Sequence, residues 1–145
     1  MVLTDSEYID HMIPHHQVAI DVSKQIMPYT NQIPIIAICR NIIRSQEYEI
    51  WEMKNMKIGN DNLNNANNSH NMDYNNIITE IDFLKHMIPH HQVAIDMSIK
   101  LLLYTTNPYM ISLAKNVIIQ QRFEIIKMND ILNSEYKFFE SLLLI

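Results

Sequence analysis

Six of the seven histidines in this 145-residue chain lie in two identical blocks. The residues from His11 to Asp21, which read His-Met-Ile-Pro-His-His-Gln-Val-Ala-Ile-Asp, recur unchanged from His86 to Asp96. Histidine is both a base that titrates near neutral pH and a common metal ligand. The two blocks are therefore where this chain can be expected to do chemistry.

Each block also holds a methionine beside its first histidine. On a helix, side chains three and four residues apart lie on one face, so the thioether of Met12 and the imidazoles of His15 and His16 can meet at a single ion. Thioether sulfur together with imidazole nitrogen favours copper, above all Cu(I), over magnesium, calcium or manganese. The pattern predicts a copper site.

Zinc and iron remain alternative metals. His11 and His15 have the i, i+4 spacing that zinc accepts, although the chain has no His-Glu-x-x-His motif. Di-iron bundles use Glu-x-x-His motifs, and no histidine of this chain follows a glutamate by three residues. Both metals are therefore weaker candidates than copper.

The likeness between the two halves continues past the blocks at a constant offset of 86 − 11 = 75 residues. A trio of Gln46, Glu49 and Met53 recurs as Gln121, Glu124 and Met128. We expect one repeat over residues 4–58 and a second over 79–134. Neither is large enough to bury a core alone, so residues 1–145 should form a single domain with pseudo-two-fold symmetry.

A helical wheel gives the expected orientation of the repeated side chains. His15 and His90 fall on the buried stripe of their helices, whereas the other four imidazoles of the blocks flank it. The repeated glutamine and glutamate face inward on the next helix, where an unpaired polar group costs about 1–3 kcal/mol and needs a partner. The predicted metal site comprises His11, Met12, His15, His16, Gln46, Glu49, Met53, His86, Met87, His90, His91, Gln121, Glu124 and Met128.

The composition predicts an all-α fold, because one glycine in the whole chain leaves little material for tight turns. Thr4 and Thr79 each precede an acidic residue by three positions and should cap helices that end near 27–28 and 104–105. The second helix of each repeat should run over 34–58 and from 108 onward. The expected architecture is a ferritin-like four-helix bundle made of two helix hairpins.

An asparagine-rich stretch over residues 59–76 has no hydrophobic period and is the expected linker between the hairpins. Its length allows the long crossover of ferritin-like bundles, and a simple up-down bundle is the alternative. Pro14 and Pro89 lie inside helices, where proline removes a backbone hydrogen bond. We interpret these prolines as positioning the histidines that follow.

The remaining sequence features limit the kinds of partner and the cellular location that can be expected. A net charge of −5 with no two adjacent basic residues argues against nucleic acid. Cys39 is the single cysteine, so no intramolecular disulfide can form. The polar N-terminus resembles neither a signal peptide nor a membrane span, which predicts an intracellular protein. The apolar stretch over residues 138–145 is a candidate interface with a second subunit.

The block His-Met-Ile-Pro-His-His-Gln-x-Ala-Ile-Asp, followed by Gln46, Glu49 and Met53, resembles the domain-of-unknown-function 305 family over nearly the whole chain, twice. The resemblance implies a ferritin-like four-helix fold, copper binding and a part in copper resistance. Val18 and Val93 stand where that family commonly has a small residue. Two other functions stay open: a metal-dependent oxidase or reductase that uses Glu49 or Glu124, and a metal-free interaction module with a polar core layer.

Overall fold

The computed structural model describes residues 2–56 and 79–143, the last nine of these as backbone only. Four α-helices and one short 3-10 turn form in this part of the chain. Their bounds are α1 Asp5–Ile26, η1 Met27–Tyr29, α2 Ile33–Asn55, α3 Glu80–Leu102 and α4 Pro108–Leu143. The all-α fold is confirmed. The expected linker over 59–76, with its histidine at position 70, lies outside the described residues.

The helices begin where the caps were predicted. The Thr4 hydroxyl accepts a hydrogen bond from the backbone N–H of Glu7, whose side chain accepts one from the Thr4 backbone, which completes a capping box. The Thr79 hydroxyl likewise accepts from the backbone N–H of Asp82 at 3.1 Å. The Asn107 side chain accepts from the first free N–H groups of α4.

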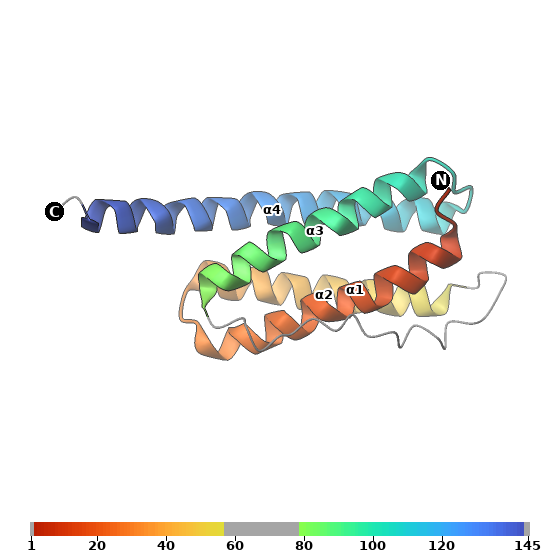
Figure 1. Cartoon of the computed structure of the whole chain (residues 1–145). Coiled ribbons are helices and arrows are strands. Elements are labelled where there is room, and N and C mark those ends of the chain that lie inside the picture. Colours follow the sequence, from red (N-terminus) through yellow and green to blue (C-terminus); the bar gives the residue numbers. More distant parts are fainter. Residues whose placement is uncertain (1, 57–78, 144–145) are drawn as a thin grey trace.

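The four helices form two antiparallel hairpins, α1 with α2 and α3 with α4, that pack against each other mainly through α1 and α3 (Figure 1). Helix α3 runs opposite to α1 and in the same direction as α2 (Figure 1). The end of α2 and the beginning of α3 therefore lie at opposite ends of the bundle. This connectivity corresponds to the crossover alternative, and the up-down alternative is wrong.

Two core clusters stabilise the bundle, one toward each end. The first core cluster joins the beginning of α1 and the end of α2 to the end of α3 and the beginning of α4. The second core cluster joins the complementary halves of the same four helices. Most members of one cluster are the equivalents, 75 residues away, of members of the other: Tyr8 and Phe83, Ile9 and Leu84, Met12 and Met87, Met53 and Met128, Met110 and Ile35.

A polar layer lies between the two clusters. On α1, His15 and His16 follow Ile13 of the first cluster and precede Val18 of the second. The same succession from one cluster to the other brackets the histidine pair of α3 and the Gln-x-x-Glu sequences of α2 and α4. Each of the four helices thus contributes polar side chains to the middle of the bundle, and we call this set the central layer.

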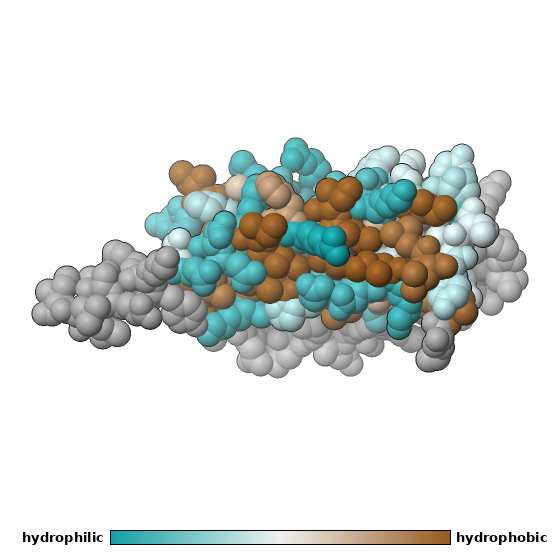
Figure 2. All heavy atoms as spheres, turned by 90° about the horizontal axis from the view of Figure 1, so that it is seen from above, coloured by the Kyte–Doolittle hydropathy of each residue, from teal (hydrophilic) through white to brown (hydrophobic). Residues whose placement is uncertain are grey.

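The outer surface carries apolar as well as polar side chains. Seen from above, brown side chains form a band along α3 and α4 (Figure 2). The exposed apolar residues of these helices include Val93, Ile99, Ile119 and Ile126. None of the helices, within the described part of the chain, has the length and apolar character that crossing a membrane requires. The interface predicted for residues 138–145 lies outside the described side chains.

Candidate metal centre

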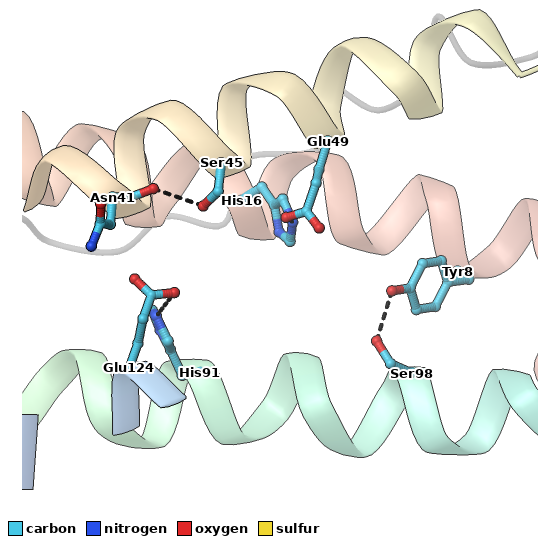
Figure 3. Close-up of polar contacts among 8 residues, drawn as sticks. All are labelled: Tyr8, His16, Asn41, Ser45, Glu49, His91, Ser98 and Glu124. Carbon is cyan, nitrogen blue, oxygen red and sulfur yellow. Dashed lines mark hydrogen bonds and ion pairs between the residues drawn. The ribbon is translucent and has the colours of Figure 1, made fainter. Parts of the chain in front are cut away.

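The central layer contains a histidine and a glutamate that contact each other across α1 and α2. The His16 Nε2 atom lies 3.0 Å from Glu49 Oε1, and both side chains are almost fully buried (Figure 3). A carboxylate oxygen only accepts hydrogen bonds, so the imidazole must donate through Nε2. The other ring nitrogen, Nδ1, carries the lone pair when the ring is neutral, and it is buried without a hydrogen-bond partner in the described chain.

Two thioethers flank this pair. Met12 precedes His16 by four residues on α1, and Met53 follows Glu49 by four residues on α2, so each methionine lies one helical turn from its polar neighbour. Both are fully buried members of the first core cluster. We call Met12, His16, Glu49 and Met53 the first half-site.

The second hairpin builds the same arrangement from Met87, His91, Glu124 and Met128, which we call the second half-site. His91 Nε2 lies 3.5 Å from Glu124 Oε1 (Figure 3), a looser approach than in the first half-site. Unlike in the first half-site, this contact is not a hydrogen bond: both ring nitrogens of His91 are buried without a hydrogen-bond partner among the described residues. Met87 and Met128 are fully buried in the second core cluster.

A row of imidazoles lies where α1 packs against α3. The rings of His15 and His90 stack with their centroids 3.6 Å apart and their planes 13° from parallel. The ring centroid of His11 lies 5.9 Å from that of His15, and the ring centroid of His86 lies 5.7 Å from that of His90. We call these four residues the imidazole row.

The environment disfavours the charged form of two of these rings, those of His86 and His90. Burial, and then the neighbouring imidazoles beginning with that of His15, hold the pKa of His90 far below its usual value. Burial also lowers the pKa of His86. Two protonated rings at stacking distance would repel each other strongly in a poorly solvated site. A neutral imidazole is the form that binds metal ions.

The buried amides of the central layer are poorly satisfied. Gln46 and Gln121 are each 2% exposed. The Gln46 side-chain oxygen and both polar atoms of the Gln121 amide have no hydrogen-bond partner in the described chain, and neither does the second oxygen of Glu49 or Glu124. Each such atom costs about 1–3 kcal/mol. The central layer therefore holds more donor and acceptor atoms than its own side chains can pair.

The ligand chemistry of the half-sites is mixed. Among the described residues, no three or more histidine, cysteine, aspartate or glutamate side chains are grouped so that they could hold a metal ion. Each half-site brings together one imidazole and one carboxylate, and only the thioethers raise the number of donors above two. Zinc and iron sites use nitrogen, oxygen or thiolate ligands, so this donor set favours a softer ion.

The structure corrects the expected orientation of the histidines. His15 is buried as predicted, but His90, its equivalent on α3, is only partly buried. His16 and His91 are fully buried rather than at the border of the stripe. The wheel assumed one buried face for each helix, whereas α1 packs against both α2 and α3. The fourteen predicted site residues consequently form two half-sites, an imidazole row and two glutamines rather than one cluster.

A buried hydrogen bond that the sequence did not predict joins the two hairpins. The hydroxyls of Tyr8 and Ser98 lie 2.7 Å apart across α1 and α3 (Figure 3). Ser98 recurs as Ser23, but Phe83 stands at the position equivalent to Tyr8. The recurrence of the serine was the only available signal, and it did not point to a partner.

Known proteins resemble this chain over most of its length. The Cu(II)-bound form of CopM shares 31% sequence identity and a TM-score of 0.80, covering 94% of this chain and 100% of that one. A fragment of domain of unknown function DUF305 from Deinococcus radiodurans has the same fold, with 22% identity, a TM-score of 0.71, and coverage of 92% and 99%.

A shorter likeness exists to an uncharacterized protein of Acanthamoeba polyphaga mimivirus, at 43% identity over 54 residues. These residues are 37% of this chain and 36% of the viral protein, so the match covers only about a third of that protein. The model of the DUF305 family, a domain of unknown function, matches residues 3–57 and 61–134. The chain therefore belongs to the DUF305 family.

Proposed function

We propose that this protein binds copper, as Cu(I) in preference to Cu(II), through the two half-sites of a pseudo-two-fold bundle. Its role would be copper buffering, trafficking or resistance. The observation that carries the proposal is the first half-site itself. The fully buried imidazole of His16 contacts Glu49 through Nε2, and its Nδ1 has no hydrogen-bond partner among the described residues. Met12, also buried, precedes His16 by one helical turn on α1.

Each group has a distinct part in this proposal. His16 and His91 supply nitrogen donors through Nδ1, and the four methionines of the half-sites supply sulfur. Glu49 orients the His16 imidazole through its hydrogen bond, as carboxylates beside metal-bound histidines commonly do, and Glu124 lies in the equivalent position 3.5 Å from His91 Nε2. The rings of the imidazole row, His11, His15, His86 and His90, offer further nitrogen donors between the two half-sites.

The similar solved structures support the choice of metal. CopM, which is about 31% identical to this chain, is described in Cu(II)-bound, Cu(I)-bound and silver-bound forms. Silver and Cu(I) are both soft monovalent ions that prefer sulfur and imidazole ligands. None of the similar structures reported above is described with zinc or iron.

An anaerobic Cu(I) competition titration against a chromophoric chelator tests the proposal. We expect tight binding by the unmodified protein, and a loss of affinity of more than about 100-fold in His16→Ala with His91→Ala. The matched control is Gln17→Ala with Gln92→Ala, because these exposed neighbours in the same blocks have Asp21 and Asp96 as their hydrogen-bond partners among the described residues. Circular dichroism checks that the helices persist in each variant.

Four outcomes would contradict the proposal in different ways. Equal affinity in the histidine variant would remove the half-sites as ligands. Loss of binding only in His15→Ala with His90→Ala would move the site to the imidazole row. Absence of binding by the unmodified protein would make the central layer a structural feature, while oxygen consumption with Fe(II) or Cu(I) would favour an oxidase.

A further inference from the structure

A solvent-facing pocket lies at one end of the bundle, between the last turn of α2 and the first turn of α4. Its volume is about 630 Å³, and the side chains that line it include Tyr48, Trp51, Glu52, Met56 and Tyr109. We call it the end pocket. Neither half-site nor the imidazole row contributes a residue to it.

The end pocket has the chemistry of a cation-binding surface. The Glu52 carboxylate is partly buried and makes no hydrogen bond or ion pair with any described residue. Met56 follows Glu52 by four residues, so its thioether and the carboxylate lie on the same face of α2. The exposed rings of Trp51 and Tyr109 complete the wall, and aromatic faces attract cations.

Methionines connect the end pocket to the first half-site. Met56 is packed against the first core cluster, which contains both Met53 and Met12. Met53 follows Glu52 directly on α2 and is already a member of the half-site. A soft ion bound at Met56 would therefore meet Met53 and then Met12 as its next sulfur donors, and each exchange keeps it in contact with thioether.

The distribution of methionines between the two ends of the bundle indicates at which end a soft metal ion would enter. Five methionines belong to or pack against the first core cluster, and three to the second. Three methionines of the first set have aliphatic equivalents in the other repeat: Met56 corresponds to Ile131, Met97 to Val22 and Met110 to Ile35. In the second set this holds for one methionine, Met27, whose equivalent is Leu102. The extra sulfur therefore lies at the end of the bundle that has the pocket.

The second hairpin provides an internal comparison. A pocket of about 300 Å³ lies at the equivalent position between α2 and α4, lined in part by Pro34, Lys127 and Ile131. Lys127 stands where the end pocket has Glu52, and Ile131 where it has Met56. Asp130 also lines this second pocket, so its carboxylate is offset by the Lys127 ammonium, and isoleucine offers no donor. The second pocket therefore lacks both the uncompensated carboxylate and the thioether of the end pocket.

We infer that the end pocket is the site at which a soft monovalent metal ion first binds, and that the ion passes inward from Met56 to Met53 and Met12. This inference rests on the proposed function, since it names the route to the first half-site. The oxidation state of the ion does not change along the route, and only its ligands exchange.

Stopped-flow transfer of Cu(I) from a chromophoric chelator to the metal-free protein tests the inference. The variant Glu52→Lys with Met56→Ile gives the end pocket the residues of the second pocket. We expect its uptake rate to fall at least tenfold, while the amount of copper bound at equilibrium and the affinity stay those of the unmodified protein. Glu52→Gln with Met56→Leu, which preserves side-chain size, should slow uptake in the same direction.

Two controls separate the route from general effects. Glu47→Lys makes the same change of net charge on an exposed residue of α2 outside the pocket, and Lys127→Arg with Ile131→Leu alters the second pocket conservatively. Both should take up copper at the unmodified rate. An unchanged rate in the end-pocket variants, or an equal slowing in a control, would overturn the inference. A loss of equilibrium binding in those variants would also overturn it, because the pocket would then hold the metal. Failure of the unmodified protein to bind any Cu(I) would instead refute the proposed function, and the inference with it.

Discussion

The copper binding proposed above would use side chains of the central layer in the arrangement that they already have. His16 is held by Glu49 through one ring nitrogen, which leaves the other as a buried lone pair. His15 and His90 are stacked at a distance that two charged rings could not tolerate. At the scale of residues, the bundle holds imidazoles and thioethers in a poorly solvated interior, where water would compete little for a bound ion.

This arrangement makes the metal-free protein sensitive to acid. The pKa of His90 lies far below its ordinary value of 6.5, so the folded protein keeps this ring neutral while the unfolded chain takes up a proton below about pH 6.5. Stability is therefore retained above that pH and lost as the pH falls below it. One such group lowers the free energy of unfolding by up to about 1.4 kcal/mol per pH unit.

Urea unfolding at pH 7.5, 6.0 and 5.0 with a copper chelator present measures this loss. The variant His90→Gln removes the titrating ring, so its free energy of unfolding should fall less steeply over the same range. Equal slopes in the two proteins would show that His90 does not carry the acid sensitivity.

The identity of the candidate ligands followed from the repeat, but their grouping did not. An exact recurrence of histidine, methionine and glutamate at one offset indicates which side chains act together. It does not indicate that His16 contacts Glu49 while His15 contacts His90, because that depends on which neighbour each face of α1 meets. A helical wheel describes one helix, and the central layer is built by contacts among four.

Helices α1 and α3 each carry a proline in their interior, and each nevertheless continues as one helix. Pro14 and Pro89 immediately precede the paired histidines, so the lost backbone hydrogen bond lies one turn before the metal candidates. The boundaries of the helices agree with those predicted to within a few residues, because hydroxyl caps, Asn107 and Pro108 define them locally. The direction of α3 relative to α2 has no comparable local signal.

If the prolines position the histidines, replacing the prolines should raise the stability of the protein and lower its affinity for Cu(I). Pro14→Ala with Pro89→Ala restores two backbone donors and removes two steric conflicts, so thermal unfolding of the metal-free protein should shift upward. The affinity for Cu(I) should fall by about tenfold, because the imidazoles after each proline move from their present geometry. Calorimetry with chelator and the competition titration measure the two effects. A more stable variant with unchanged affinity would leave the prolines with no role in the site.

The two ends of the molecule differ where their sequences differ. In the first core cluster the Tyr8 hydroxyl reaches Ser98, and Ala114 belongs to the same cluster. In the second, Phe83 lacks the hydroxyl, and Cys39, the equivalent of Ala114, places its thiol beside Ser23. Burial raises the pKa of this thiol to about 12, so it stays protonated. The Cys39 thiol therefore lies beside Ser23 in the second core cluster, as the Tyr8 hydroxyl lies beside Ser98 in the first.

This compensation predicts a coupled pair of substitutions. Phe83→Tyr alone should destabilise the protein by about 1–3 kcal/mol, because the added hydroxyl overpacks the space beside Cys39. Adding Cys39→Ala should recover most of that loss, since the pair then has the residues found at the other end. Chemical unfolding of both single variants and the double variant gives the coupling energy. Additive effects would contradict the compensation.

The stacking of His15 on His90 means that a residue meets its own equivalent, and a surface with this property can pair with an identical copy of itself. One hairpin of this kind, produced as a separate polypeptide, would be a self-associating subunit whose assembly depends on its concentration. With both hairpins in one chain, each meets the other at an effective concentration that can be on the order of millimolar. Completing the central layer becomes a unimolecular event, so the site can form in a cell that makes only a few copies of the protein.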